Sequence, residues 1–421
     1  MAGGDVEVVV VGAGAAGIAA ARRLHDSGVG CLLVEARPRL GGRALTVIDE
    51  SGFALDLGCG WLHSADRNPW CDIAKAQGAS IDTSLPAWAR PSLEFGFSRA
   101  EQEEFGEAMG SFFARLEHVA QNQTDVPSSA ALDPGCRWNG LINAVSTYIS
   151  GAEWDQVSAK DFDRYADSGV NWRAIEGLGT VIRNYGVDLP VTLGCRVIGV
   201  DHRDERLRVE TEKGAITADQ VIIAIPSSLL AREQLAFMPA LPQKIEAAQG
   251  LPLGLDDKLF ITLDRAEEFD PDVRLFGHTD RAATGAYQFR PLGRPQIEAY
   301  FGGKLAAELE ANGDGAFFDF AVSELTGALG SDFRRRLKPI QIHRWGLDPF
   351  SLGSYSYALP GFADCRRALA EPVDNRLFFA GEACSVSDFS TAHGAWQTGV
   401  TAADQVLAAR KNSTRARSAR V

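Results

Sequence analysis

Three glycines near the N-terminus have the spacing that binds a dinucleotide pyrophosphate. Gly12, Gly14 and Gly17 form a G-x-G-x-x-G pattern between residues 7–11, which predict a buried strand, and residues 15–26, which predict a helix. Glycine permits the tight turn, the close approach of a phosphate and the close packing of the helix on the strand, while the helix N-terminus offers N–H donors. The pattern therefore predicts a strand–turn–helix unit that binds a dinucleotide.

Glu35 supplies the second part of this pattern. It ends another apolar segment, residues 30–35, about 20 residues beyond the glycines, where a carboxylate accepts hydrogen bonds from the adenosine ribose. A glycine-rich turn followed by a surface glutamate is the alternative, and the two features together disfavour it. Beyond the ribose position, Arg37 precedes Gly42, whose backbone can approach a ligand, and Arg43, whose guanidinium can contact a pyrophosphate oxygen.

The two glycines and Arg43 at residues 41–43, together with two further glycine-containing regions, indicate that the dinucleotide is FAD and not NAD. Residues 56–63 form a glycine-rich turn that can lie against a flat ring, and residues 378–382 end a strand with an acid before a helix opens at residues 391–395. A helix N-terminus aimed at the flavin N1/C2 carbonyl stabilises the negative charge of the reduced ring. With the first loop, these regions give the candidate cofactor residues Ala16, Gly60, Trp61, Gly381, Glu382, Thr391 and Ala392.

The remaining pattern predicts an α/β protein: an FAD-binding Rossmann-like domain assembled from discontinuous segments, with an inserted α+β substrate domain that contains a mixed sheet. Residues 191–226 read as a second βαβ-like half, whereas residues 258–346 alternate as strands with one helix, at 316–329, before a final strand at 340–345. The predicted FAD-binding domain comprises residues 1–85, 190–257 and 361–410. The substrate domain comprises 86–189 and 258–360, and 411–421 form a basic, disordered tail.

Composition excludes several functional classes. The chain has 421 residues, 45% of them hydrophobic, and a formal charge of −13, which disfavours nucleic acid as a partner. The longest weakly polar run is too short to span a bilayer, so we expect no membrane segment and a cytoplasmic location. Seven scattered cysteines contain no C-x-x-C pair, so we expect neither a disulfide framework nor a metal site.

Together these residues resemble the flavin-containing amine oxidase superfamily, which includes monoamine, polyamine and spermine oxidases. The resemblance runs from Val8 to about Ala409. It implies a p-hydroxybenzoate-hydroxylase-like FAD domain carrying an inserted mixed-sheet substrate domain. It also implies that Val197 contacts adenine through its backbone and that Glu382 lies on the ribityl side of the flavin.

The resemblance assigns further residues to catalysis. Lys258 resembles the family lysine that holds a water against flavin N5. Trp345 and Tyr355 resemble the W…GxY segment, in which the tyrosine forms one wall of an aromatic cage, and His63 resembles the histidine of the polyamine oxidase W-I-H segment. From the residues alone, a lysine that opens a strand faces solvent and an aromatic residue packs in the core, and a structural role for His63 stays open.

Departures from the family pattern refine these expectations. Ser354 stands where monoamine oxidases carry the cysteine that attaches the flavin, so FAD is expected to bind noncovalently. Thr391 stands where the second cage tyrosine would be, which leaves the cage at best half formed. Residues 58–63 lack the arginine with which L-amino-acid oxidases bind the substrate carboxylate.

The expected reaction is oxidation of a small-molecule amine. Hydride passes from the carbon next to the amine nitrogen to flavin N5, the imine hydrolyses to an aldehyde or ketone, and O2 reoxidises the flavin to give H2O2. A desaturase or protoporphyrinogen-type oxidase on the same scaffold is one alternative, and a non-catalytic FAD-binding protein is another.

Overall fold

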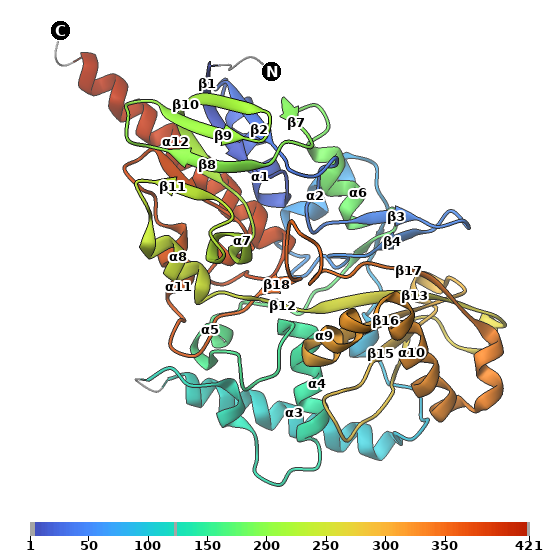
Figure 1. Cartoon of the computed structure of the whole chain (residues 1–421). Coiled ribbons are helices and arrows are strands. Elements are labelled where there is room, and N and C mark those ends of the chain that lie inside the picture. Colours follow the sequence, from blue (N-terminus) through green and yellow to red (C-terminus); the bar gives the residue numbers. More distant parts are fainter. Residues whose placement is uncertain (1–4, 122–123, 419–421) are drawn as a thin grey trace.

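The computed structural model describes residues 5–121 and 124–418, which form two lobes (Figure 1). The upper lobe contains both the N-terminal βαβ unit and the C-terminal helix. The lower lobe consists of the central part of the chain. Within the described residues, no helix combines the length and apolar character needed to cross a bilayer.

A mixed eight-stranded sheet forms the centre of the upper lobe. Its strands, in spatial order, are β11 (Ala236–Met238), β8 (Val197–Asp201), β9 (Leu207–Thr211), β10 (Gly214–Ile223), β1 (Asp5–Val11), β2 (Cys31–Val34) and β7 (Val191–Thr192), with β19 (Leu377–Phe379) also paired to β10. The central strand β1 lies parallel to both β2 and β10. Three segments distant in the sequence thus meet in one sheet.

Apolar residues on both faces of β1 explain its central position. Val8 and Val10 pack in one core with α1 (Ala15–Asp26) and α12 (Ala392–Ser418), and Val9 and Val11 pack in a second core on the opposite face. A strand covered on both faces reads as an uninterrupted apolar run, as residues 8–11 do. Figure 1 shows α12 running beside α1 along this sheet. Helix α12 includes part of the predicted basic tail, of which residues 419–421 lie outside the described part.

The prediction of a second βαβ-like half at residues 191–226 is wrong. Strands β8, β9 and β10 form an antiparallel meander instead. The connections at residues 202–206 and 212–213 are too short to hold a crossover helix, which a parallel pair requires. The other upper-lobe helices are α2 (Pro69–Ala76), α6 (Leu178–Tyr185), α7 (Ser227–Ala231), α8 (Pro242–Gln249) and α11 (Cys365–Ala370).

The lower lobe is built on a five-stranded antiparallel sheet. Its order is β14 (Val273–Phe276), β15 (Ala286–Phe289), β16 (Gln296–Gly302), β13 (Asp256–Leu263) and β17 (Leu337–Ile342). Helices α9 (Gly303–Asn312) and α10 (Asp314–Leu329) contribute to the apolar core on one face. The strand predicted at 340–345 corresponds to β17, which begins and ends earlier in the chain. It ends earlier because residues 343–345 leave the sheet and turn toward the cavity described below.

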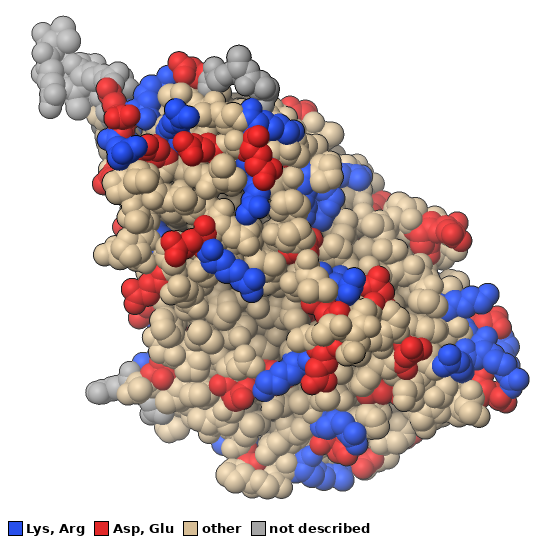
Figure 2. Space-filling view, viewed as in Figure 1, with Lys and Arg blue, Asp and Glu red and all other residues tan. Residues whose placement is uncertain are grey.

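The rest of the lower lobe is largely helical, with α3 (Arg99–Ala120), α4 (Asn139–Ser150) and α5 (Ala159–Asp163). Helix α3 buries Phe112, Leu116 and Ala120 on one face, and a capping box between Ser98 and Glu101 fixes its start. Three two-stranded sheets complete the fold: β3 (Thr46–Ile48) with β4 (Ala54–Asp56), β5 (Ile81–Asp82) with β6 (Arg173–Ala174), and β12 (Leu253–Gly254) with β18 (Tyr355–Ser356). On the face in Figure 2, acidic and basic side chains are interspersed rather than gathered by sign.

Candidate functional site

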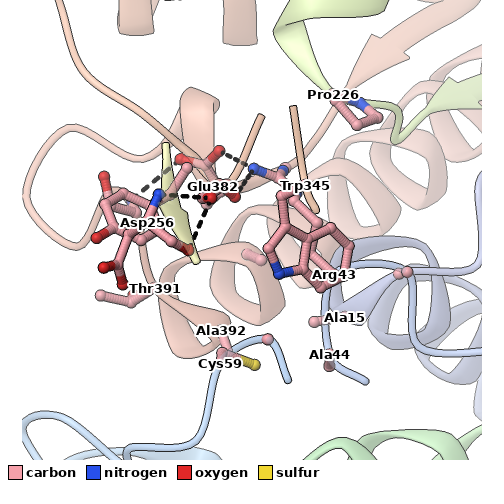
Figure 3. A pocket seen from close by; sticks show the side chains of 18 of the residues that line it. Ala15, Arg43, Ala44, Cys59, Pro226, Asp256, Trp345, Glu382, Thr391 and Ala392 are labelled. Atoms are coloured by element: carbon pink, nitrogen blue, oxygen red, sulfur yellow. Dashed lines mark hydrogen bonds and ion pairs between the residues drawn. The ribbon is translucent and has the colours of Figure 1, made fainter. Parts of the chain in front are cut away.

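A cavity of about 650 Å³ lies at the junction of the lobes and is lined by segments from both. Its volume is in the range of sites that enclose small molecules. The residues predicted from the sequence to bind cofactor or to act in catalysis all line this cavity, except Gly17. Figure 3 shows part of the wall, where Arg43, Trp345, Glu382 and Thr391 converge from separate segments.

The glycines of the first loop serve different purposes. A Cβ built on Gly17 would lie 1.8 Å from the carbonyl oxygen of Gly12, and one on Gly12 would lie 2.5 Å from that of Ala224. Both glycines therefore allow close packing of backbone on backbone. A Cβ on Gly14, by contrast, meets no atom within 4 Å and faces the cavity. This open space at the N-terminus of α1 fits a bound pyrophosphate.

The substitution Gly14→Ala is therefore expected to leave the fold intact and to weaken FAD binding by roughly tenfold or more, because the new methyl group takes space needed by the ligand. Flavin absorbance of the purified protein and titration of the apoprotein with FAD measure this. Gly106→Ala is the matched control, since Gly106 also has open space around it but lies in α3, away from the cavity. Unchanged affinity for FAD in Gly14→Ala would place the pyrophosphate elsewhere.

Glu35 and Arg37 shape the wall beyond this loop. The Glu35 carboxylate accepts hydrogen bonds from the backbone N–H groups of Ala13, at 2.7 Å, and Arg37, at 2.8 Å. The Arg37 guanidinium binds Asp348 at 2.6 Å. Burial acts to raise the pKa of Asp348, but hydrogen bonding from His343 and the charge of Arg37 outweigh it and lower the pKa to about 2. Contact between Glu35 and the ribose stays a prediction.

Arg43 and Glu382 form a partly buried ion pair between the first and last segments of the chain. The Arg43 Nη1 atom lies 2.8 Å from Glu382 Oε1 and also donates to the carbonyl oxygen of Ser354. Glu382 accepts further hydrogen bonds from Ser356 Oγ, at 2.6 Å, and from the N–H of Ser390. Burial acts to raise the pKa of Glu382, but Arg43 and Arg366 hold it below its usual value. An ionised Glu382 therefore fixes the wall beside the predicted ribityl position.

Lys258 lies inside the protein, not in solvent. Its Nζ atom donates to the backbone carbonyl of Asp56 at 2.9 Å and lies 3.4 Å from Glu298 Oε1. A Cβ on Gly60 would lie 3.2 Å from this Nζ atom, so the glycine-rich turn passes directly over the lysine. The same turn packs on Trp345, whose indole N–H donates to Leu57 O. The structure thus brings the predicted lysine and tryptophan to one wall.

Asp256 is a buried acid on the same strand, two residues before Lys258. It lines the cavity, and its Oδ1 atom is buried without a hydrogen-bond partner among the described residues. Burial raises the pKa of Asp256 to about 8, against the opposing effects of Lys258 and Tyr355. Alternate residues of a strand lie on the same face, so Asp256 and Lys258 share one face of β13. Asp256 was therefore recognisable from the sequence in principle.

His63 is held as a neutral acceptor. Asn171 donates from Nδ2 to Gly169 O, which leaves its Oδ1 to accept from His63 Nδ1 at 2.6 Å. These bonds assign the ring proton to Nδ1 and leave Nε2 with a lone pair. Burial lowers the pKa of His63, despite the opposing hydrogen bond to Asn171. Trp88, on the cavity wall, lies near this ring and packs edge-on against Trp61, with 4.4 Å between their ring centroids.

The remaining predicted residues have clear structural contacts. Tyr355 lies on the cavity wall, and its hydroxyl donates to Tyr148 O at 2.7 Å. Thr391 is buried at the start of α12, where Oγ1 accepts from the N–H of Gly394 at 3.0 Å and so caps the helix. Ser354, at the position of the monoamine oxidase cysteine, exchanges hydrogen bonds with the backbone of Asp256. Val197 lines the cavity from β8.

Sequence reasoning missed several cavity residues because their positions depend on strands and loops distant in the sequence. They are Trp88, Tyr148, Asp256, Arg274, Phe276 and Tyr300. Within the described residues, no three His, Cys, Asp or Glu side chains gather as metal ligands would.

Comparisons with known proteins agree with this site. The family model for flavin-containing amine oxidoreductases matches residues 15–133 and 138–407. Polyamine oxidase 2 of Arabidopsis thaliana is 32% identical over 94% of this chain and 87% of its own length, and polyamine oxidase 3 of Oryza sativa subsp. japonica is 31% identical over 94% and 88%. Lysine-specific histone demethylase 1 homolog 2 of Arabidopsis thaliana is 28% identical and spans 96% of this chain but 59% of its own.

Among solved structures, a putrescine oxidase bound to putrescine has the same fold, with a TM-score of 0.77 at 17% identity over 96% of this chain and 99% of that one. The amine oxidase relationship and the noncovalent binding of FAD expected from the sequence are confirmed. The chain belongs to the family of flavin-containing amine oxidoreductases and is an FAD-dependent amine oxidase.

Proposed function

We propose that this enzyme oxidises the C–N bond of a small aliphatic amine and transfers the electrons to O2. The observation that carries the proposal is Asp256, whose buried Oδ1 has no hydrogen-bond partner among the described residues although it lines the cavity. A buried carboxylate oxygen without a hydrogen-bond partner is costly unless a ligand satisfies it. An amine nitrogen beside Lys258 and Tyr355 would do so.

The protein residues position the amine and manage its proton. When bound, FAD accepts the two electrons and the hydrogen of the C–H bond next to nitrogen. Asp256 takes the ammonium proton, which leaves the nitrogen lone pair available, and the neutral His63 Nε2 offers a second acceptor. The aromatic side chains of Trp61, Trp88 and Tyr300 line the cavity and limit the access of water to the amine. Overall, amine, water and O2 give a carbonyl compound, a released amine or ammonia, and H2O2.

The relatives support an aliphatic substrate, since they are named for polyamine and putrescine oxidation. The desaturase or protoporphyrinogen-type alternative lacks comparable support, because the family model and the curated relatives concern amines or histone lysines. Location in the cytoplasm remains a prediction from the sequence.

A peroxide-coupled screen of amines, diamines, polyamines and amino acids tests the proposal. The variant Lys258→Met is expected to retain FAD, because the predicted cofactor residues come from other elements, and to lose oxidation rate on the order of 10²-fold. Lys338→Met, which removes an exposed lysine from the neighbouring strand β17, is expected to change nothing. A wild-type enzyme that binds FAD but yields no peroxide with any amine would contradict the proposal.

A further inference from the structure

Arg274 is an arginine of the cavity wall that has no counter-ion in the described part of the chain. It lies on β14, and its Nε atom is buried without a hydrogen-bond partner. Among the described residues, its guanidinium makes no hydrogen bond or ion pair, and it lies over the ring of Phe276, 4.5 Å from the ring centroid. Arg37 and Arg43, in the same cavity, are each paired with an acid at 2.6 and 2.8 Å. Arg274 thus differs from these two arginines.

The acids nearest to Arg274 in the sheet are already engaged. Asp272, two residues earlier, binds Arg173 at 2.8 Å and accepts from Gln288 Nε2 at 2.7 Å. Glu298 lies 3.4 Å from Lys258 Nζ and accepts a hydrogen bond from the Tyr300 hydroxyl. A largely desolvated guanidinium that has no acidic partner among the described residues can bind an anionic group of a ligand.

The sheet register places Arg274 at a distance from the reaction centre but on the same face. One row across the sheet holds, in order, Phe276, Ala286, Tyr300 and Lys258. Residues opposite one another in antiparallel strands share a face, and Arg274 shares the face of Phe276 because the two are separated by two positions. Three strand spacings, about 14 Å, separate the backbones of β14 and β13. On this face, Ala286 and Tyr300 lie between Phe276 and Lys258, and Gln288 and Glu298 form the adjacent row that begins at Arg274.

We infer that Arg274 binds a carboxylate of the substrate, so that the preferred amine is an ω-amino acid whose carboxylate is several carbons from the oxidised C–N bond. This inference rests on the proposed function, in which Asp256 receives the amine end. The two ends of a zwitterionic chain then each meet an opposite charge. A polyamine of the same length would instead place a second ammonium beside an unpaired guanidinium, which is unfavourable in a partly desolvated cavity.

Substrates of equal length but different end group test the inference with the holoenzyme. We expect kcat/KM to be highest for 6-aminohexanoate, lower for hexylamine and lowest for 1,6-diaminohexane. Two further substrates, 4-aminobutanoate and 8-aminooctanoate, measure how kcat/KM depends on chain length. Arg274→Met should lower kcat/KM for 6-aminohexanoate by roughly 10²-fold or more while sparing hexylamine. Arg274→Lys keeps the positive charge but lacks the planar guanidinium. Its kcat/KM for 6-aminohexanoate should therefore lie between those of wild type and Arg274→Met. Arg334→Met, at an exposed arginine, is the control.

Binding of hexanoate, followed by the change in flavin absorbance, gives a readout independent of turnover. Wild type should bind hexanoate and Arg274→Met should not. A wild type that prefers the diamine, or equal hexanoate affinity in both proteins, would overturn the inference. If no amine is oxidised but hexanoate binding still depends on Arg274, the proposed function fails while the anion site stands.

Discussion

Replacement of Asp256 by asparagine is expected to lower kcat/KM for amine oxidation by roughly 10²–10⁴-fold, the range for loss of a general base. The amide occupies the same volume and can still accept a hydrogen bond, but it cannot take the ammonium proton. FAD should remain bound, because Asp256 lies on β13 and none of the predicted cofactor residues comes from that strand.

The pH dependence identifies the group more specifically than the loss of rate. Burial raises the pKa of Asp256 to about 8, so its carboxyl is mostly protonated in the free enzyme below that pH and becomes a base above it. Wild-type kcat/KM should therefore rise as pH increases toward about 8 and fall again near the pKa of the amine, roughly 10. In Asp256→Asn, the rise of kcat/KM on the acid side of the pH profile should shift upward to the pKa of the amine, because no carboxylate is left to take the ammonium proton.

Asp264→Asn is the matched control, since Asp264 is an exposed acid just beyond the far end of the same strand. Its profile should coincide with that of wild type. An Asp256→Asn enzyme with an unshifted acid limb would show that another group titrates, and the proton would have to be assigned elsewhere.

The sequence predicted the parts of the site that depend on local pattern. The glycine loop, α1 and Glu35 were recognisable because strand, turn and helix follow one another within a few tens of residues. The meander at β8–β10 was misread because apolar runs alone do not distinguish an antiparallel hairpin from a parallel pair. The domain boundaries remain predictions.

Residues whose role depends on sheet register were not recognisable in this way. Arg274 lies in β14. Its place on the cavity wall depends on how β14 pairs, through β15 and β16, with β13. Neither β14 nor β15 was predicted, since each has only four residues and little alternation. Lys258 shows the same limitation: its pattern indicated a solvent-facing lysine, whereas pairing with Glu298 and Asp56 keeps it inside.

Arg366 offers the second large effect, this time on stability. Its side chain, 1% exposed, makes three hydrogen bonds to Asp161 on α5, all within 3.1 Å, and donates to Ser356 Oγ at 2.8 Å, which in turn donates to Glu382. Its guanidinium also covers the ring of Phe389, 3.9 Å away. One side chain therefore joins the lower lobe to the acid beside the predicted flavin position.

Arg366→Met is expected to lower the free energy of unfolding by about 3–5 kcal/mol, because it leaves the Asp161 carboxylate buried without its partner. FAD affinity should fall as well, since Ser356 and Glu382 lose an anchored neighbour. Urea unfolding of the apoprotein measures the first effect, and titration with FAD measures the second. The double variant Arg366→Met/Asp161→Leu should recover much of the stability, because two apolar groups remove the stranded charge.

Asp364→Asn provides the comparison for this ion pair, because Asp364 binds Arg164 at 2.9 Å and joins the same two segments at the surface, where its side chain is 78% exposed. Exposed pairs contribute about 0–1 kcal/mol, so this variant should unfold almost as wild type does. The difference between the two variants then measures the cost of stranding a charge in the interior. If Arg366→Met were no less stable than Asp364→Asn, the buried pair would not hold the lobes together, and the position of Glu382 would have to depend on Arg43, Ser356 and Ser390 without Arg366.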